Sequence, residues 1–230
     1  MKKIMITVGL TFSLLSLFGC HNKIFAQEQP FEAMQQSYKG VLPCADCSGI
    51  ETSLFLQQDG TYILREVYQV KPKEDQAFAQ YGKWARTADK LVLTEANGEK
   101  RYFRPVGDNL EMLDIHGDPI QSKTPHLAMH YQLQPAEQRM PETPMPLSGM
   151  VRYQADNVVF TDCTTGKVIP MATSSMLHKA YMNMPHSPDQ LVFVSMDGHF
   201  QVEPGGDDGR GHKLLVADSN ISLDPGKHCQ

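Results

Sequence analysis

The 230-residue sequence lacks an apolar run long enough to cross a membrane as a helix, and it lacks catalytic signatures. A spanning helix needs about 20 apolar residues, whereas the apolar stretch 4–18 has only 15. No G-x-S-x-G, H-E-x-x-H or glycine-rich phosphate loop is present. Positive charge is also scarce, because 21 Lys and Arg face 26 Asp and Glu, a net charge of −5. The sequence therefore gives no support for an enzyme or for nucleic-acid binding.

The first 19 residues are typical of a secretory signal peptide, with a basic start followed by the apolar stretch. The segment ends in Leu17-Phe18-Gly19-Cys20, which resembles a bacterial lipobox, so Cys20 is expected to carry a diacylglycerol and a further acyl chain such as palmitate. Residues 20–36 would then form a lipidated tether. His21 in place of Asp predicts delivery by the lipoprotein sorting machinery to the outer membrane, facing the periplasm. An ordinary signal peptide with a chance cysteine is the alternative.

Cysteine is used sparingly, with five in the chain, and lipidation of Cys20 leaves four. The periplasm permits disulfide bonds, and an even number of remaining cysteines favours them. Four cysteines allow three pairings, so the residues themselves do not decide how Cys44, Cys47, Cys163 and Cys229 are joined.

Proline divides the mature chain into two parts. The segment 132–146 contains Pro135, Pro141, Pro144 and Pro146 with few large apolar residues, which predicts a semi-extended linker. We therefore expect an N-terminal domain over 37–131 and a C-terminal domain over 147–230.

The N-terminal domain has the two-residue periodicity of half-buried strands. In 50–57 the even positions are mostly apolar and the odd positions mostly polar, with Phe55 as the exception. Asp59-Gly60, Asn97-Gly98 and Gly107-Asp108 separate such runs, as turns do in β-hairpins. An up-and-down barrel or a sandwich follows. The predicted core residues are Tyr62, Trp84, Leu91, Leu93 and Leu113.

The C-terminal domain alternates strand patterns with one helix. Thr173-Ser174-Ser175 can cap a helix, and Pro185 lies just beyond its expected end. Strand patterns precede and follow this helix, an order that suits a small barrel of the OB type. The predicted fold class is therefore all-β, with a larger barrel followed by an OB-like one.

Cys44-Ala45-Asp46-Cys47 precedes a strand pattern rather than a helix. A thioredoxin-like pair begins a helix, whose dipole lowers the thiol pKa, so oxidoreductase chemistry is not favoured. Structural zinc needs a second ligand pair at suitable spacing, which the sequence does not offer. A local disulfide and a dithiol that binds soft Cu(I) stay open, and the disulfide is the simpler reading.

Several stretches resemble the NlpE (CutF) family of outer-membrane lipoproteins. They are the lipobox, "SYKGVLPCADCSGIETSLFL", "YGKWARTADKLVLT", "GDNLEMLD", "FTDCTTGK" and the penultimate Cys229. The resemblance implies an N-terminal lipocalin-like barrel and a C-terminal OB-like domain. It also implies a stress sensor that acts on the periplasmic domain of the Cpx sensor kinase when lipoprotein traffic, disulfide formation or surface contact goes wrong. A link to copper tolerance is implied as well.

The resemblance also implies that Cys163 pairs with Cys229, which would make a periplasmic disulfide oxidase a partner. This bond would close 229 − 163 = 66 positions, a stabilisation of about 4 kcal/mol from chain entropy. Its formation could be a redox switch or a constitutive staple. The sequence thus predicts an envelope-stress sensor without a required cofactor, and the alternatives are a copper protein with ligands Cys44 and Cys47 or a carrier of an apolar ligand.

Overall fold

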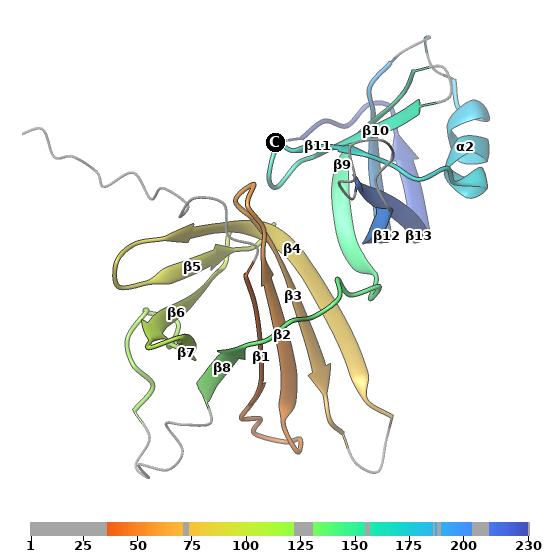
Figure 1. The fold of residues 1–230 in the computed structure, drawn as a ribbon. Helices are drawn as coiled ribbons and strands as arrows, with labels where there is room; N and C mark the ends of the chain where they lie inside the picture. The colour runs from red at the N-terminus through yellow and green to blue at the C-terminus, as the bar shows by residue number, and fades with distance from the viewer. Residues whose placement is uncertain are drawn as a thin grey trace, which may run out of the picture.

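A computed structural model describes residues 36–70, 74–121, 131–154, 157–185, 187, 190–203 and 212–229. It contains two β domains joined by an extended segment (Figure 1). The elements, in chain order, are β1 Gln36–Leu42, β2 Ile50–Leu56, β3 Thr61–Tyr68, β4 Gln76–Arg86, β5 Leu91–Thr94, β6 Lys100–Val106, β7 Asn109–Met112, β8 Gln132–Pro135, β9 Met145–Gln154, β10 Asn157–Asp162, β11 Val168–Pro170, α2 Ser175–Met182, β12 Val192–Glu203 and β13 His212–Asp224.

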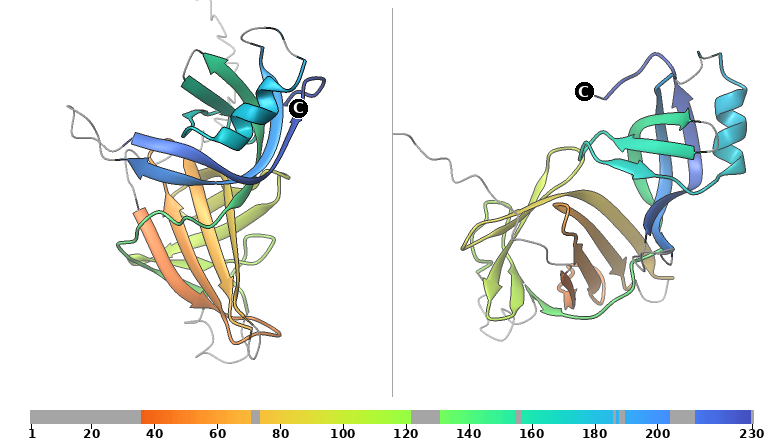
Figure 2. Two further views of the ribbon diagram at one scale, coloured as in Figure 1. Left: turned by 90° about the vertical axis from the view of Figure 1, so that its right-hand side faces the viewer. Right: turned by 45° about the horizontal axis from the view of Figure 1, so that its top comes forward.

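Strands β1 to β8 form a closed up-and-down barrel. Each strand pairs antiparallel with the next, and β8 closes the barrel by pairing with β1. Gly60 and Gly98 take positive φ angles of 82° and 84° in the tight turns that the sequence predicts, a conformation that glycine adopts without strain. Figure 2 shows the strands wrapping around a common axis. The expectation of an all-β fold with an up-and-down barrel is confirmed.

Large side chains fill the barrel interior. Alternate residues of each strand point inward, so one face of every strand contributes to a single cluster. Tyr62, Leu91 and Leu93 are fully buried, and Trp84 and Leu113 are 5% and 3% exposed, as the sequence predicts. The indole of Trp84 donates a hydrogen bond to the backbone oxygen of Gln57, 2.9 Å away.

The segment 132–146, expected as a linker, is partly made of strands. Its first four residues form β8, and its last two belong to β9. Leu133 and Met145 are fully buried, and extended backbone suits a strand as well as a linker. The remaining residues, 136–144, lie against the barrel: Arg65 donates from Nε to Oγ1 of Thr143 at 3.0 Å, and Gln138 donates to the backbone oxygen of Tyr38 at 3.1 Å.

The C-terminal domain is the predicted OB-like barrel. Its sheet has the order β11-β10-β9-β12-β13, and a parallel bridge from Met171 to Leu215 joins the two outer strands. Helix α2 follows β11, and the Ser174 side chain caps it by accepting from the backbone N–H of Leu177 at 3.3 Å. Helix α2 has 8 residues. Among the described residues, no helix is long and apolar enough to cross a bilayer.

Candidate functional site

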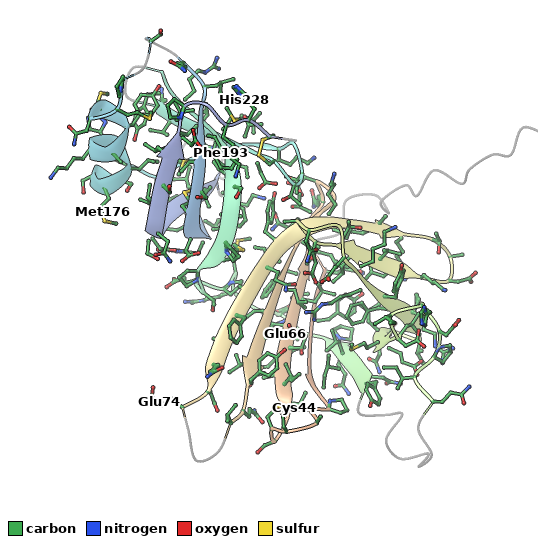
Figure 3. The ribbon with its side chains drawn as sticks, turned by 180° about the vertical axis from the view of Figure 1, so that it is seen from behind. Cys44, Glu66, Glu74, Met176, Phe193 and His228 are labelled. Atoms are coloured by element: carbon green, nitrogen blue, oxygen red, sulfur yellow. A yellow bond between two sulfur atoms is a disulfide. The ribbon has the colours of Figure 1, made fainter. Side chains whose placement is uncertain are left out.

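Cys44 and Cys47 form a disulfide in the loop between β1 and β2, with their Cα atoms 5.3 Å apart. The loop is held at its base, because the N–H of Ser48 donates to Gln69 O and the N–H of Gln69 donates to Gly49 O, both at 3.0 Å. No helix follows, so no helix dipole acts on this pair. Figure 3 places Cys44 at the end of the barrel far from the C-terminal domain.

A metal role for Cys44 and Cys47 would first need this bond to be reduced, because thiolates rather than disulfides ligate metals. Among the residues that the structure describes, no group of three or more His, Cys, Asp or Glu side chains is placed to hold a metal ion. Copper binding by this pair therefore stays a prediction.

The second disulfide joins Cys163 to Cys229, with a Cα–Cα distance of 5.2 Å. Cys163 lies in the turn between β10 and β11, and its N–H donates to Ser148 O at 2.9 Å. Cys229 lies in the segment after β13, and Figure 3 labels its neighbour in the chain, His228. The bond therefore ties the end of the chain to the turn 162–167, and this is the pairing that the family resemblance implies.

Asp162 organises that turn. The residue is 1% exposed, and its Oδ2 accepts from the N–H and the hydroxyl of Thr165, both at 2.7 Å. Burial raises the pKa of Asp162, although Thr165, Thr164 and then Lys83 oppose the increase. A buried carboxylate that accepts two hydrogen bonds from one turn fixes the backbone beside Cys163.

The C-terminal segment is also held by short-range contacts. The N–H of Gly226 donates to Oδ1 of Asp224 at 2.9 Å, and Nζ of Lys227 lies 4.3 Å from the centre of the Phe193 ring. These contacts bring the chain back from β13 toward the turn, so Cys229 is positioned for the bond.

The interface between the two domains could not be predicted from the sequence. On β2, β3 and β4 the outward side chains Phe55, Ile63, Ala79 and Tyr81 are buried in one cluster with the core of the C-terminal domain. The departure of Phe55 from the polar-outward pattern was the available signal. Since an apolar outward residue can equally be a harmless exception on a surface, the pattern alone could not show what covers it.

Two family models match the chain. The model of the NlpE N-terminal domain matches residues 38–123, and that of the NlpE C-terminal OB domain matches 141–230. The chain is 44% identical to the protein called lipoprotein NlpE of Escherichia coli (strain K12), over an alignment that covers 99% of this chain and 97% of that one.

The chain belongs to the NlpE family.

A crystal structure described as the Cpx pathway activator NlpE from Escherichia coli is also similar, with 46% sequence identity and a TM-score of 0.39. The alignment covers 86% of this chain and 99% of that chain. The two family models together include all four cysteines of the two disulfides. Cys44 and Cys47 lie in the N-terminal match, and Cys163 and Cys229 lie in the C-terminal match. The lipidation candidate Cys20 lies outside the described residues.

Proposed function

We propose that this protein is a lipid-anchored outer-membrane lipoprotein that reports envelope stress by activating the Cpx sensor kinase. Membership of the NlpE family carries the proposal, because the similarity extends over nearly the whole chain at 44% identity. The related Escherichia coli structure is described as a Cpx pathway activator. Acylation of Cys20 would anchor the chain stably, since two or more acyl chains are needed for lasting attachment.

The Cys163–Cys229 bond is the proposed reader of disulfide formation. When it forms, the two thiols lose two protons and two electrons, and a disulfide of the periplasmic oxidase becomes a dithiol. The pair is suited to a reader because the bond closes 66 positions. A chain without the bond keeps a C-terminal domain that is less stable by about 4 kcal/mol, a large share of the 5–15 kcal/mol typical of a protein.

The test compares envelope-stress reporter output in cells that make the wild type or Cys229→Ser at equal levels. We expect higher output from Cys229→Ser, and Cys47→Ser serves as the matched control in the other disulfide. Equal output from Cys229→Ser and the wild type would reduce the bond to a staple. Deletion of the Cpx kinase should remove the increase in reporter output from Cys229→Ser, because the proposed signal passes through that kinase.

Copper binding at reduced Cys44 and Cys47 is a second prediction, and it makes no demand on the Cys163–Cys229 bond. The purified, reduced protein should bind one Cu(I) through this dithiol, since soft thiolates prefer that ion. Cys44→Ser should abolish the binding, and unchanged stoichiometry in Cys44→Ser would exclude this site. The apolar carrier is not favoured, because Tyr62, Phe103, Leu54 and neighbouring side chains fill the barrel interior.

A further inference from the structure

The C-terminal barrel is covered on one side by helix α2 and on the opposite side by the N-terminal barrel. Helix α2 packs on the side that faces away from the N-terminal barrel, as the two views in Figure 2 show, and contributes the buried side chains Leu177 and Tyr181. The other side lies against the outer face of β2, β3 and β4. The barrel residues in this contact are Phe55, Ile63, Ala79 and Tyr81, which we call the covered face.

The covered face belongs to the outside of the barrel. In β3, Tyr62 and Leu64 point into the interior cluster, so Ile63 between them points outward. Even so, Ile63 is fully buried, and Ala79 and Tyr81 are 4% and 5% exposed. Without the C-terminal domain these neighbouring apolar side chains would form a contiguous exposed patch, which in a soluble domain usually marks an interaction site.

Aromatic and charged contacts fix the C-terminal domain on the covered face. The ring of Tyr81 lies 4.9 Å from that of Phe200, centre to centre, at an angle of 60°, a favourable aromatic geometry. Nζ of Lys213 lies 4.8 Å from the centre of the Phe200 ring. The same ammonium donates to Gln57 and lies 3.5 Å from Oδ2 of Asp59, both in the barrel.

Asp59 and Lys213, which meet across the contact between the domains, shift each other's pKa values. Burial would raise the pKa of Asp59, but the Thr61 hydrogen bond, Lys213 and Lys167 hold it below its ordinary value. Burial lowers the pKa of Lys213, and Asp59 opposes the decrease. A cation from β13 and a carboxylate from the β2–β3 turn therefore meet at the rim of the contact, where the Asp59 side chain is 38% exposed.

The turn that holds Cys163 reaches the same edge. Burial raises the pKa of Tyr81 to about 12, and Thr165 in the turn is close enough to oppose the increase. Figure 1 shows the turn between β10 and β11 directed toward the N-terminal barrel, with the C-terminus beside it. The Cys163–Cys229 bond thus braces a turn that takes part in the contact between the domains.

We propose that the C-terminal domain is an autoinhibitory cover on β2, β3 and β4, held in place through the turn 162–167 by the Cys163–Cys229 bond. A chain in which this bond is not formed loses the bracing of the turn, the C-terminal domain leaves the barrel, and the covered face becomes accessible. The covered form is silent and the uncovered form signals. This inference rests on the proposed function and names how it is regulated.

The experiment opens the interface while leaving the disulfide intact. Lys213→Glu places a second negative charge against Asp59, and like charges juxtaposed in an interface cost several kcal/mol. Lys179→Glu is the matched control, because Lys179 is exposed on α2, away from the contact. Both changes are made in the full chain carrying Ala79→Cys, and thiol labelling at position 79 is followed by peptide mapping.

We expect Lys213→Glu to raise the labelling rate at position 79 by about tenfold or more, with the Cys163–Cys229 bond still formed. Reporter output should rise in the same variant without Ala79→Cys, and Lys179→Glu should change neither quantity. Combining Lys213→Glu with Cys229→Ser should give no more output than the higher single variant, because both act by uncovering the same face.

The outcomes separate this inference from the proposed function. If Cys229→Ser raises output while Lys213→Glu raises labelling alone, the cover is not the switch and the proposed function stands. If Cys229→Ser and Lys213→Glu both raise labelling at position 79 and neither raises reporter output, the redox part of the proposed function fails as well. Tyr81→Glu provides a second opening variant, and unchanged labelling in both opening variants would overturn the proposal.

Discussion

Removal of the Cys163–Cys229 bond should cost much more stability than removal of the Cys44–Cys47 bond. The two bonds close 66 and 3 positions. Chain-entropy arithmetic gives about 4 kcal/mol for the longer loop and about 2 kcal/mol for the shorter one. The double variants Cys163→Ala/Cys229→Ala and Cys44→Ala/Cys47→Ala therefore form a matched pair, each without two thiols that could pair wrongly.

The assay is equilibrium unfolding in urea, followed by far-UV circular dichroism and by fluorescence. Trp84, the single tryptophan of the chain, reports the N-terminal barrel, whereas circular dichroism reports both domains. With a denaturant slope of about 2 kcal/mol per molar urea, loss of the longer bond should move the C-terminal transition by about 2 M. The Trp84 transition should move less, so the two probes should separate in this variant.

A smaller shift for Cys163→Ala/Cys229→Ala than for Cys44→Ala/Cys47→Ala would refute the reasoning. It would mean that the contacts of the turn 162–167 and of the segment after β13 already restrict the unbonded chain. In that case the oxidation state of the pair could not be read as a change in the stability of the C-terminal domain.

Two further predictions concern buried charges and tyrosines. Arg101→Met should lower the free energy of unfolding by roughly 3–5 kcal/mol, because Glu66, 6% exposed, loses the guanidinium 2.7 Å away. Lys39→Met, at the more exposed pair with Glu51, should cost under about 1 kcal/mol, and equal losses in urea unfolding would contradict this. Burial raises the pKa values of Tyr81 and Tyr153 to about 12, so both hydroxyls stay neutral in the fold while the unfolded chain ionises near pH 10. The stabilisation that comes from keeping these two hydroxyls neutral is complete below pH 10 and is lost as the pH rises toward 12. Tyrosinate absorbance and circular dichroism, recorded together against pH, test this prediction. Ionisation of Tyr81 and Tyr153 near pH 10 in the folded protein would contradict it.

The parts of the fold that depend on neighbouring residues could be predicted from the sequence. Glycine turns and alternating strands predicted a barrel or a sandwich, the family resemblance favoured the barrel, and a serine cap predicted the start of α2. These features are local, so a few adjacent residues determine them. The burial of Tyr62 and Trp84 followed from their positions on the inward face of predicted strands.

The parts that depend on distant residues could not be predicted in this way. Strand β8 lies in a proline-containing segment, and only its pairing with β1 distinguishes it from a linker. The residues alone allowed three pairings of four cysteines, because pairing depends on where the turn after β10 and the chain end meet. The cluster that buries Phe55 includes residues of the C-terminal domain that lie 90 or more positions further along the chain, from Met145 on.

The separation of Cys163 and Cys229 by 66 positions has a consequence for biogenesis. A chain exported from its N-terminus delivers the barrel first, with Ile63 and Tyr81 still lacking the β13 residues that will pack near them. Cys163 arrives later, and Cys229 emerges only after β11, α2, β12 and β13. The Cys163–Cys229 bond can therefore form only after the last strands of the C-terminal domain have crossed, so a chain that stalls before Cys229 cannot acquire it. The bond records translocation of the C-terminal domain as well as an oxidising environment.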